Sequence, residues 1–511
     1  MRKDGEEEIF NSKIRLKLQT FSILLITSVS YALSLPKFDL WLLSFFFLVP
    51  LLHITERSEF LSPFKIFFLF SFFAHLIVLY WIPDVMISYG GMNSAIGILA
   101  LILLSMYISF FYGISGIFIK KALLTNRFSP LLIPFIWISK DIIIENLFGG
   151  FPWSFIGYSQ YKNILFIQTA EIGGIHFITF LILLINLLIY LYIINKDHKI
   201  IIFLIMVIMF NYISGYFLLK NDKKINKKKK AISAGIIQPN TGQNFFSTIK
   251  WRKVTLEELL HDSGQLKNKG AEFVIWPEYT TSLYPLQNRA NYNKIMDFVR
   301  ENVPVFAGFT DFRNSKEIYN SIILFKKNGI EKYNKVRLVP YGEYILFKEL
   351  LFFIKKITQE VSEFTPGKSI HNLTLKGINF AVPICYEIIY PGLVRKFIKK
   401  GGEVIVLVSN DSWYGTSSAP FQLLSMSVFR SIENRRYILR STSNGISALI
   451  KPSGSVYKSV PLNKRENFIV SFKYRQKRTI FLKFGYLFPW FSLIFSILFF
   501  IYIKFRRKTG Q

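Results

Sequence analysis

The stretch Phe380-Ala381-Val382-Pro383-Ile384-Cys385-Tyr386-Glu387 contains the one cysteine of this 511-residue chain. The residues before Cys385 are apolar and typical of a buried strand, and an acidic residue follows two positions after it. One cysteine cannot form a disulfide within the chain, so its thiol is either an inert core group or a reactive one. Taken alone the stretch favours the inert group, and the choice depends on the rest of the domain.

Two other strand-like runs end at an ionisable side chain. Val274-Ile275-Trp276-Pro277-Glu278 ends on a carboxylate, and Tyr333-Asn334-Lys335 places an amine at a strand end. Sheets of α/β proteins commonly build their sites at the ends of strands. Glutamates and lysines in such places are usually just solvated, so neither run decides the question alone. Together with Cys385, they favour a reactive thiol in a site with Glu278 and Lys335.

Short β-rich runs alternate with amphipathic segments between residues 231 and 475. Alternating strands and helices followed by a strand-rich end predict an α/β layered domain. The predicted strands are 232–238, 273–276, 303–310, 319–326, 329–334, 378–384, 404–409, 436–441, 446–451 and 467–473. The predicted helices are 249–268, 289–302, 390–400 and 421–434.

The chain is 51% apolar and has 53 phenylalanines, and its long apolar runs lie before residue 220 and after residue 480. A transmembrane helix needs roughly 20 mostly apolar residues. Eight segments are candidates: 17–35, 38–54, 60–83, 94–119, 129–147, 165–194, 199–219 and 480–503. We therefore expect a membrane domain with about seven helices over 1–219, a basic linker over 220–230, the α/β domain over 231–475 and a C-terminal transmembrane helix over 480–504.

The formal net charge of +31 would fit a nucleic-acid-binding protein, but the placement of the basic residues argues against one. Lysines and arginines flank the predicted spans, as Lys120 and Lys504 do. By the positive-inside rule both termini lie in the cytoplasm, and seven crossings place the α/β domain outside it. The basic run from Lys220 to Lys230 then lies on the outer side, and we interpret it as a solvated linker.

The runs around Glu278, Lys335 and Cys385 resemble those of the nitrilase superfamily, whose members carry a Glu–Lys–Cys triad. The flanking apolar spans and the stretch Gly150-Phe151-Pro152-Trp153 narrow the resemblance to the membrane-embedded apolipoprotein N-acyltransferase family. The resemblance implies a polytopic α-helical membrane domain, about eight spans in all, and an extramembrane nitrilase-like αββα sandwich.

The resemblance also implies roles for individual residues. Cys385 is the expected nucleophile, Glu278 the base that takes the thiol proton, and Lys335 the cation that favours the thiolate and stabilises the oxyanion. Supporting roles are expected for Glu343, Glu387 and Tyr386, the last through its backbone N–H. Substrate contacts are expected at Trp251, Asn320, Trp413, Tyr414 and Arg440.

Residues 345–364 mix apolar side chains, Phe352 and Phe353 among them, with lysines. An amphipathic segment of this kind fits an arm that dips into the bilayer interface and gates lipid entry. A packed helical insertion would show the same pattern, and both interpretations stay open.

For a member of this family, the implied reaction moves an acyl chain from a phospholipid, with phosphatidylethanolamine as the expected donor, to an apolipoprotein. Cys385 would hold the chain as a thioester until the α-amine of an N-terminal diacylglyceryl-cysteine accepts it, which gives ping-pong kinetics. We expect no metal, cofactor or nucleic acid, and a monomer in the bacterial inner membrane with its catalytic domain on the periplasmic face.

Two alternatives belong to other classes of protein. A membrane-anchored nitrilase-type amidase would use the same triad with water as the acceptor. A transporter or receptor would carry charged residues along its spans, and the mostly apolar spans argue against it.

Overall fold

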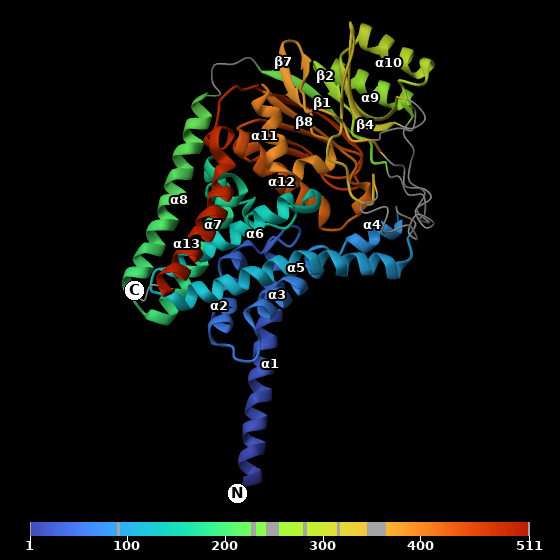
Figure 1. Ribbon diagram of the computed structural model, residues 1–511. Coiled ribbons are helices and arrows are strands. Elements are labelled where there is room, and N and C mark those ends of the chain that lie inside the picture. The colour runs from blue at the N-terminus through green and yellow to red at the C-terminus, as the bar shows by residue number, and fades with distance from the viewer. Residues whose placement is uncertain are drawn as a thin grey trace. The chain divides into compact units, whose positions relative to one another are not determined.

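Figure 1 shows a computed structural model of the chain, which describes residues 2–88, 92–225, 231–241, 255–278, 284–313, 317–344 and 364–508. The chain folds into two compact units. The helical unit is made of Met1–Tyr80, Leu99–Gly215 and Phe484–Gln511. The sheet unit is made of Trp81–Ile98 and Tyr216–Lys483.

Long apolar helices build the helical unit. The helices that lie wholly or mostly in it are α1 Arg2–Ser34, α2 Leu48–Arg57, α3 Pro63–Val78, α5 Ser94–Thr125, α6 Ile133–Asn146, α7 Ala170–Asn195, α8 His198–Ile225 and α13 Leu487–Lys508. Five described stretches are long and apolar enough to cross a membrane: Lys13–Ser34, Ser94–Thr125, Phe166–Asn195, His198–Asp222 and Leu487–Arg506. A sixth is added if α3 and the short helix α4, Ile82–Ser88, count as one broken span.

Two of the eight predicted segments are not among these stretches. Segment 38–54 contains a 3₁₀ turn, Trp41–Phe45, and the start of α2, which has 10 residues. Segment 129–147 contains α6, which has 14 residues between the 3₁₀ turns Ser129–Leu132 and Leu147–Gly149. At about 1.5 Å per residue, α6 reaches about 21 Å, which is less than the roughly 30 Å of a hydrocarbon core.

The ionisable residues of α6 are buried, and each has a partner inside the helical unit. Lys140 pairs with Asp141, and its Nζ lies 3.5 Å from the centroid of the Tyr112 ring. Glu145 Oε2 lies 3.0 Å from Nε2 of His176. Such pairing is how charged side chains are accommodated among apolar helices.

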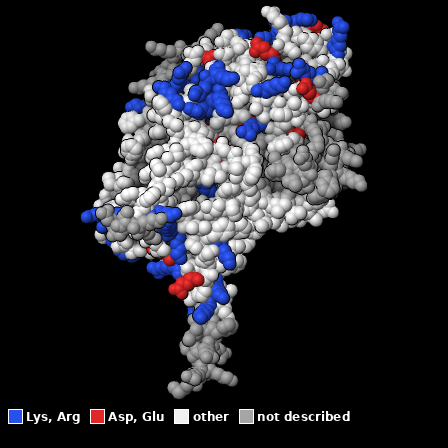
Figure 2. Space-filling view, in the orientation of Figure 1, with Lys and Arg blue, Asp and Glu red and all other residues white. Residues whose placement is uncertain are grey.

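Exposed apolar side chains line the long helices. On α8 they include Phe203, Met206 and Phe210, and on α13 they include Ile494 and Leu498. Apolar surfaces of this extent mark contact with a membrane or a partner. Figure 2 shows one face of the molecule, on which the lysines and arginines gather in patches between broad uncharged areas.

The sheet unit contains two six-stranded sheets, ordered β12-β1-β2-β3-β4-β5 and β11-β10-β9-β8-β7-β6. Their strands are β1 Ile232–Gln238, β2 Phe273–Ile275, β3 Val305–Phe312, β4 Ile318–Lys326, β5 Gly329–Asn334, β6 Leu373–Leu375, β7 Ile378–Ala381, β8 Val404–Ser409, β9 Ile438–Thr442, β10 Ser447–Ile450, β11 Val456–Val460 and β12 Glu466–Phe472. The central strands β1, β2 and β3 run parallel, as do β7, β8 and β9.

The two sheets pack face to face. Phe380 of β7 lies with its ring centroid 5.4 Å from that of Phe273 in β2 and 5.1 Å from that of Phe306 in β3. Two helices cover the outer face of the first sheet: α9 (Leu256–Asn268) and α10 (Arg289–Glu301). Two others cover the outer face of the second sheet: α11 (Pro391–Lys399) and α12 (Ala419–Asn434) (Figure 1). This is the predicted αββα sandwich.

Candidate active site

Three buried side chains from three strand ends meet in the sheet unit. Glu278 follows β2, Lys335 comes directly after β5, and Cys385 opens the 3₁₀ turn Cys385–Ile389 that follows β7. Lys335 Nζ lies 3.5 Å from Glu278 Oε1, and both charges act on the nearby Cys385 thiol. The structure therefore brings together the three residues that the sequence singled out.

The backbone of Glu278 passes close to strand β3. A Cβ atom at Gly308 of β3 would lie 2.6 Å from the Cα of Glu278, closer than side-chain carbons approach one another. A glycine at this position lets the chain after β2 turn across the strand end. Glu278 is then held by two donors, the backbone N–H of Asn410 at 2.8 Å and Nδ2 of Asn320 at 2.7 Å.

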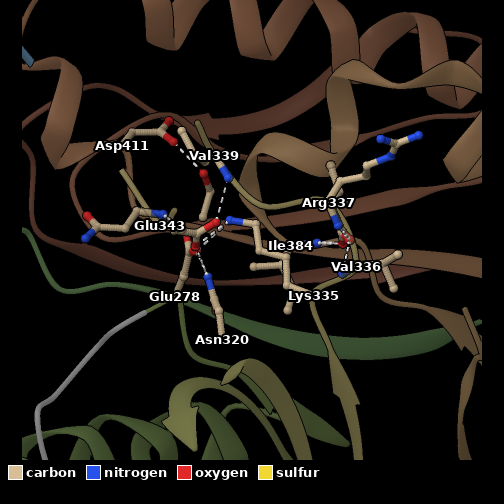
Figure 3. A network of polar contacts seen from close by, with 12 residues as sticks. Glu278, Asn320, Lys335, Val336, Arg337, Val339, Glu343, Ile384 and Asp411 are labelled. Atoms are coloured by element: carbon tan, nitrogen blue, oxygen red, sulfur yellow. Dashed lines mark hydrogen bonds and ion pairs between the residues drawn. The ribbon is translucent and has the colours of Figure 1, made fainter. Parts of the chain in front are cut away.

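Lys335 and two carboxylates form one network, which Figure 3 shows from close by. Lys335 Nζ donates to Oε1 of Glu343 at 2.9 Å. Asn320 Nδ2 also donates to that oxygen, at 2.6 Å, so the amide of Asn320 joins Glu343 to Glu278. The N–H of Val339 donates to the second oxygen of Glu343 at 2.8 Å. Each member of the network is therefore fixed by at least one other group.

The charges of this network shift the pKa values of its members. Burial alone would lower the pKa of Lys335, but the carboxylates of Glu343 and Glu278 outweigh it and raise that pKa, so the ammonium stays charged. Burial raises the pKa of Glu278, Lys335 lowers it and Glu343 raises it again, and the net shift is upward. A buried carboxylate with a raised pKa is a stronger base than an exposed one, and it lies beside a thiol.

Cys385 stands on a strained turn. Its φ is 47°, in the left-handed region that non-glycine residues rarely adopt. Glu387 holds this turn because its Oε2 accepts the N–H of Ile384 at 2.9 Å. Its Oε1 accepts the N–H of Val336 at 2.8 Å and the N–H of Arg337 at 3.1 Å. Glu387 therefore ties the turn of Cys385 to the segment that follows Lys335.

The environment of Cys385 favours the protonated form of its thiol. Burial and the charge of Glu278 raise the pKa of Cys385, and Lys335 lowers it by less, so the net shift is upward. We expected the ammonium to favour the thiolate, and the structure shows burial to be the larger effect. A carboxylate beside a protonated thiol can take its proton, which is the chemistry that this arrangement allows.

Three of the other expected site residues, Tyr386, Trp413 and Tyr414, lie in 3₁₀ turns of the sheet unit. Tyr386 follows Cys385 in the same turn. Its buried hydroxyl accepts a hydrogen bond from the hydroxyl of Tyr390, with 3.3 Å between the two oxygens. Trp413 and Tyr414 belong to the 3₁₀ turn Asp411–Tyr414, and Tyr414 lies near enough to interact with the charge of Cys385. Trp251 and residues 345–363 of the predicted arm 345–364 lie outside the described residues.

Arg440, a further residue expected to contact substrate, takes part in a buried ion pair. It is fully buried in β9, and its Nη2 lies 2.6 Å from Oδ2 of Asp411. The guanidinium is therefore held by Asp411 in this structure, and the expected contact between Arg440 and substrate stays a prediction.

Sequence reasoning missed three residues near the site. Ser409 donates to Asp411 Oδ1 at 2.6 Å, at the end of β8. Trp81 donates to Oε1 of Gln422 at 3.2 Å, and its ring meets that of Tyr414 edge to face at 5.2 Å. The stretch Asn410-Asp411-Ser412 contains Asp411 and directly follows Ser409, whereas Trp81 lies between apolar runs with no local signal.

Comparisons with known proteins agree with this architecture. The family model for the apolipoprotein N-acyltransferase N-terminal domain matches residues 27–188, and the carbon-nitrogen hydrolase model matches residues 233–475. The apolipoprotein N-acyltransferase of Geobacter metallireducens is 27% identical over 506 residues and covers 95% of each chain. That of Aquifex aeolicus is 28% identical over 452 residues, which cover 88% of this chain and 97% of the relative.

Among solved structures, Saccharomyces cerevisiae Nit3, a member of branch 10 of the nitrilase superfamily, matches 48% of this chain and 90% of its own at 16% identity and a TM-score of 0.38. The two family models match parts of both the helical and the sheet regions. The chain belongs to the apolipoprotein N-acyltransferase family.

Proposed function

We propose that this membrane enzyme moves an acyl chain from a phospholipid to the α-amine of the N-terminal diacylglyceryl-cysteine of an apolipoprotein, through a thioester on Cys385. The relatives named apolipoprotein N-acyltransferase support the overall reaction. The observation that carries the proposed chemistry is the buried network in which Lys335 lies between Glu278 and Glu343, beside the thiol.

The first half of the reaction acylates the enzyme. Glu278 takes the proton of the Cys385 thiol while Sγ attacks the carbonyl carbon of the phospholipid ester. Negative charge develops on the carbonyl oxygen, and the ammonium of Lys335 stabilises it together with the N–H of Tyr386. The intermediate collapses as the ester C–O bond breaks. Glu278 returns the proton to the departing alkoxide, and a lysophospholipid leaves.

The second half regenerates the thiol. The α-amine attacks the thioester carbonyl, Glu278 accepts the proton that the amine loses, and the C–S bond breaks to give an amide. The proton then returns to Sγ. Because each half uses the same carbonyl position and the same base, the two substrates react in turn, and ping-pong kinetics follow.

The donor and the location are part of the proposal. We propose phosphatidylethanolamine as the donor, a monomer as the active form, and the bacterial inner membrane as the site, with the sheet unit on the periplasmic face. Spans of the kind found in the helical unit would keep the enzyme where its lipid donor is. A soluble amidase would gain nothing from them.

The test supplies the purified enzyme in detergent with phosphatidylethanolamine and a synthetic peptide that begins with diacylglyceryl-cysteine. We expect the peptide to gain the mass of one acyl chain and the lipid to appear as its lyso form in equal amount. The Cys385→Ala variant gives neither product. Free fatty acid in place of acylated peptide, or cleavage of small amides at a higher rate, would favour the amidase.

A further inference from the structure

Arg337 carries a positive charge two positions after Lys335. Its side chain is exposed, and within the described part of the chain its guanidinium has no carboxylate or other hydrogen-bond acceptor as a partner. By contrast, the guanidinium of Arg440 in the same unit is buried against Asp411. The charge of Arg337 is therefore available to a ligand.

The backbone of Arg337 is tied to the turn of the nucleophile. Its N–H donates to Oε1 of Glu387 at 3.1 Å, and the other oxygen of Glu387 accepts the N–H of Ile384 at 2.9 Å. Ile384 directly precedes Cys385. One buried carboxylate therefore joins the two segments. Figure 3 shows that the side chain of Arg337 points away from the network around Lys335, so its guanidinium is not part of that network.

An aromatic pair holds the side chain of Arg337. Its Cζ atom lies 5.4 Å from the centroid of the Tyr390 ring, a distance at which the face of a ring attracts a cation. The Tyr390 ring meets that of Tyr386 edge to face at 5.5 Å, and Tyr386 directly follows Cys385. A guanidinium packed on a ring can still donate from the N–H groups at its edge. Arg337 thus presents a planar donor group beside the turn that carries the thiol.

The donors of a guanidinium match the oxygens of a phosphate, which they bind in pairs. The proposed lipid donor contains such a group, because only the glycerol backbone separates its phosphodiester from the ester that reacts. The proposed acceptor, an N-terminal diacylglyceryl-cysteine, has no phosphate. Of the two substrates, the lipid donor is therefore the one that matches the guanidinium of Arg337.

The lysine of the site is already engaged by carboxylates. Lys335 Nζ lies 2.9 Å from an oxygen of Glu343 and 3.5 Å from an oxygen of Glu278, so two carboxylates share one ammonium. A phosphate beside this network would meet net negative charge, and the juxtaposition of like charges is unfavourable. The phosphate needs a second cation, and Arg337 supplies one outside the network.

We propose that Arg337 binds the phosphodiester of the lipid donor and thereby selects phospholipids over uncharged glycerolipids. The inference rests on the proposed acyl transfer and names a specificity-determining residue for its first half. When the lysophospholipid leaves, its phosphate leaves with it, and the acceptor brings no phosphate in its place. Variants at Arg337 should therefore slow acylation of the enzyme and leave the second half of the reaction unchanged.

The test compares two lipid donors that share their acyl chains, phosphatidylethanolamine and diacylglycerol, each in mixed detergent micelles. Thioester formation on the full-length enzyme is followed by intact mass spectrometry. Arg337→Gln should lower the second-order rate of acylation by phosphatidylethanolamine about 5- to 50-fold and leave the rate with diacylglycerol unchanged. Arg337→Lys keeps the charge without the planar fork, so its rate should lie between those of the wild type and Arg337→Gln.

Arg300→Gln is the matched control. Arg300 on α10 is also exposed, and it pairs with Asp297 at 2.9 Å. The variant removes the same charge elsewhere on the sheet unit and should act as wild type with both donors. Equal slowing of Arg337→Gln with both donors would make Arg337 merely structural, and an unchanged rate with phosphatidylethanolamine would mean that another group binds the phosphate; either result overturns the proposal.

Inorganic phosphate has the same chemistry without the lipid, so it distinguishes the two sources of the anion. At millimolar concentration it should slow acylation only slightly, and equally in the wild type and in Arg337→Gln. Strong inhibition that Arg337→Gln abolishes would make free phosphate the ligand and overturn the assignment to the lipid.

A binding measurement separates this inference from the acyl-transfer proposal. An ether analogue of phosphatidylethanolamine has the phosphodiester but no ester to attack, so it can only occupy the site. It should protect Cys385 from iodoacetamide, and Arg337→Gln should need about 5- to 50-fold more of it for equal protection. If this difference is seen but no thioester forms from any lipid, the acyl-transfer proposal fails and the phosphate contact stands. Equal protection of both proteins, with normal thioester formation, would contradict the contact alone.

Discussion

The Nζ of Lys335 lies 2.9 Å from Oε1 of Glu343, and both groups are buried. Glu343 is itself fixed, because its other oxygen accepts the N–H of Val339 at 2.8 Å. The ammonium is therefore held in place before any substrate arrives. A cation fixed in this way stabilises a developing oxyanion without reorganisation, which is the basis of the role proposed for Lys335.

Glu343→Gln tests this orientation. The amide keeps the shape of the side chain but loses the charge that holds the ammonium, and a hydrogen bond to a charged group contributes about 1.5–3 kcal/mol. We expect the rate of enzyme acylation by phospholipid to fall about 10- to 100-fold, measured by single-turnover kinetics. Glu466→Gln, at the end of β12, is the control and should act as wild type. An unchanged rate in Glu343→Gln would show that Lys335 does not depend on Glu343.

The pH dependence of acylation tests Glu278 as the base. Because burial raises the pKa of Glu278, the rate should rise with pH through a value above the ordinary glutamate pKa of about 4.3. The hydrogen bond from Asn320 lowers that pKa, so Asn320→Ala should move the rising limb to higher pH. Ser321→Ala, on the same strand, should leave the limb in place. A limb that moves to lower pH would exclude Glu278 as the group that titrates.

Glu387→Gln should destabilise the fold as well as the site. Glu387 accepts the N–H groups of Ile384, Val336 and Arg337 and the hydroxyl of Tyr333, and it is fully buried. A glutamine offers one acceptor oxygen and turns an NH₂ group toward donors. We expect a loss of about 2–4 kcal/mol, seen as a lower Tm in detergent. An unchanged Tm would mean that these donors find other partners.

Much of the sheet unit follows from its sequence. Strands β1 and β8 begin and end where the pattern predicts. In β8 the pattern is a continuous run of apolar residues with strong β-propensity, up to the last residue, Ser409. The sequence pattern did not predict strands β6 and β11, for two different reasons. β6 has three residues, and the first four residues of β11 are exposed, so neither leaves an apolar pattern. Both are edge strands, where burial constrains the sequence least.

The contacts around the three central residues of the site were less predictable than those residues themselves. Glu278, Lys335 and Cys385 each end a strand-like run, and that local signal led to them together with the family resemblance. The ion pair of Arg440 with Asp411 was not predicted, because the two residues lie 29 positions apart and a pairing at that distance leaves no local mark. The balance between burial and charge that keeps Cys385 protonated likewise depends on packing, which the sequence alone does not give.

Trp81→Ala tests a contact that the sequence did not predict. The Trp81 ring packs edge to face on Tyr414, a contact that contributes about 0.5–1.5 kcal/mol. Without it, Tyr414 should be less well fixed, and acylation by phospholipid should slow about two- to tenfold while alkylation of the free thiol is unchanged. Trp81→Phe keeps a ring and should retain most of the rate. Equal losses in acylation and alkylation would point to a folding defect instead.

The covalent intermediate is the centre of the account, and intact mass spectrometry tests it most directly. The purified enzyme is incubated with phosphatidylethanolamine alone, beside Cys385→Ala, and each protein is weighed. We predict a gain equal to one acyl chain in the wild type, removed by hydroxylamine and absent from the variant. A wild-type protein that gains no mass, although its thiol still reacts with alkylating probes, would contradict the proposal that Cys385 carries the acyl chain.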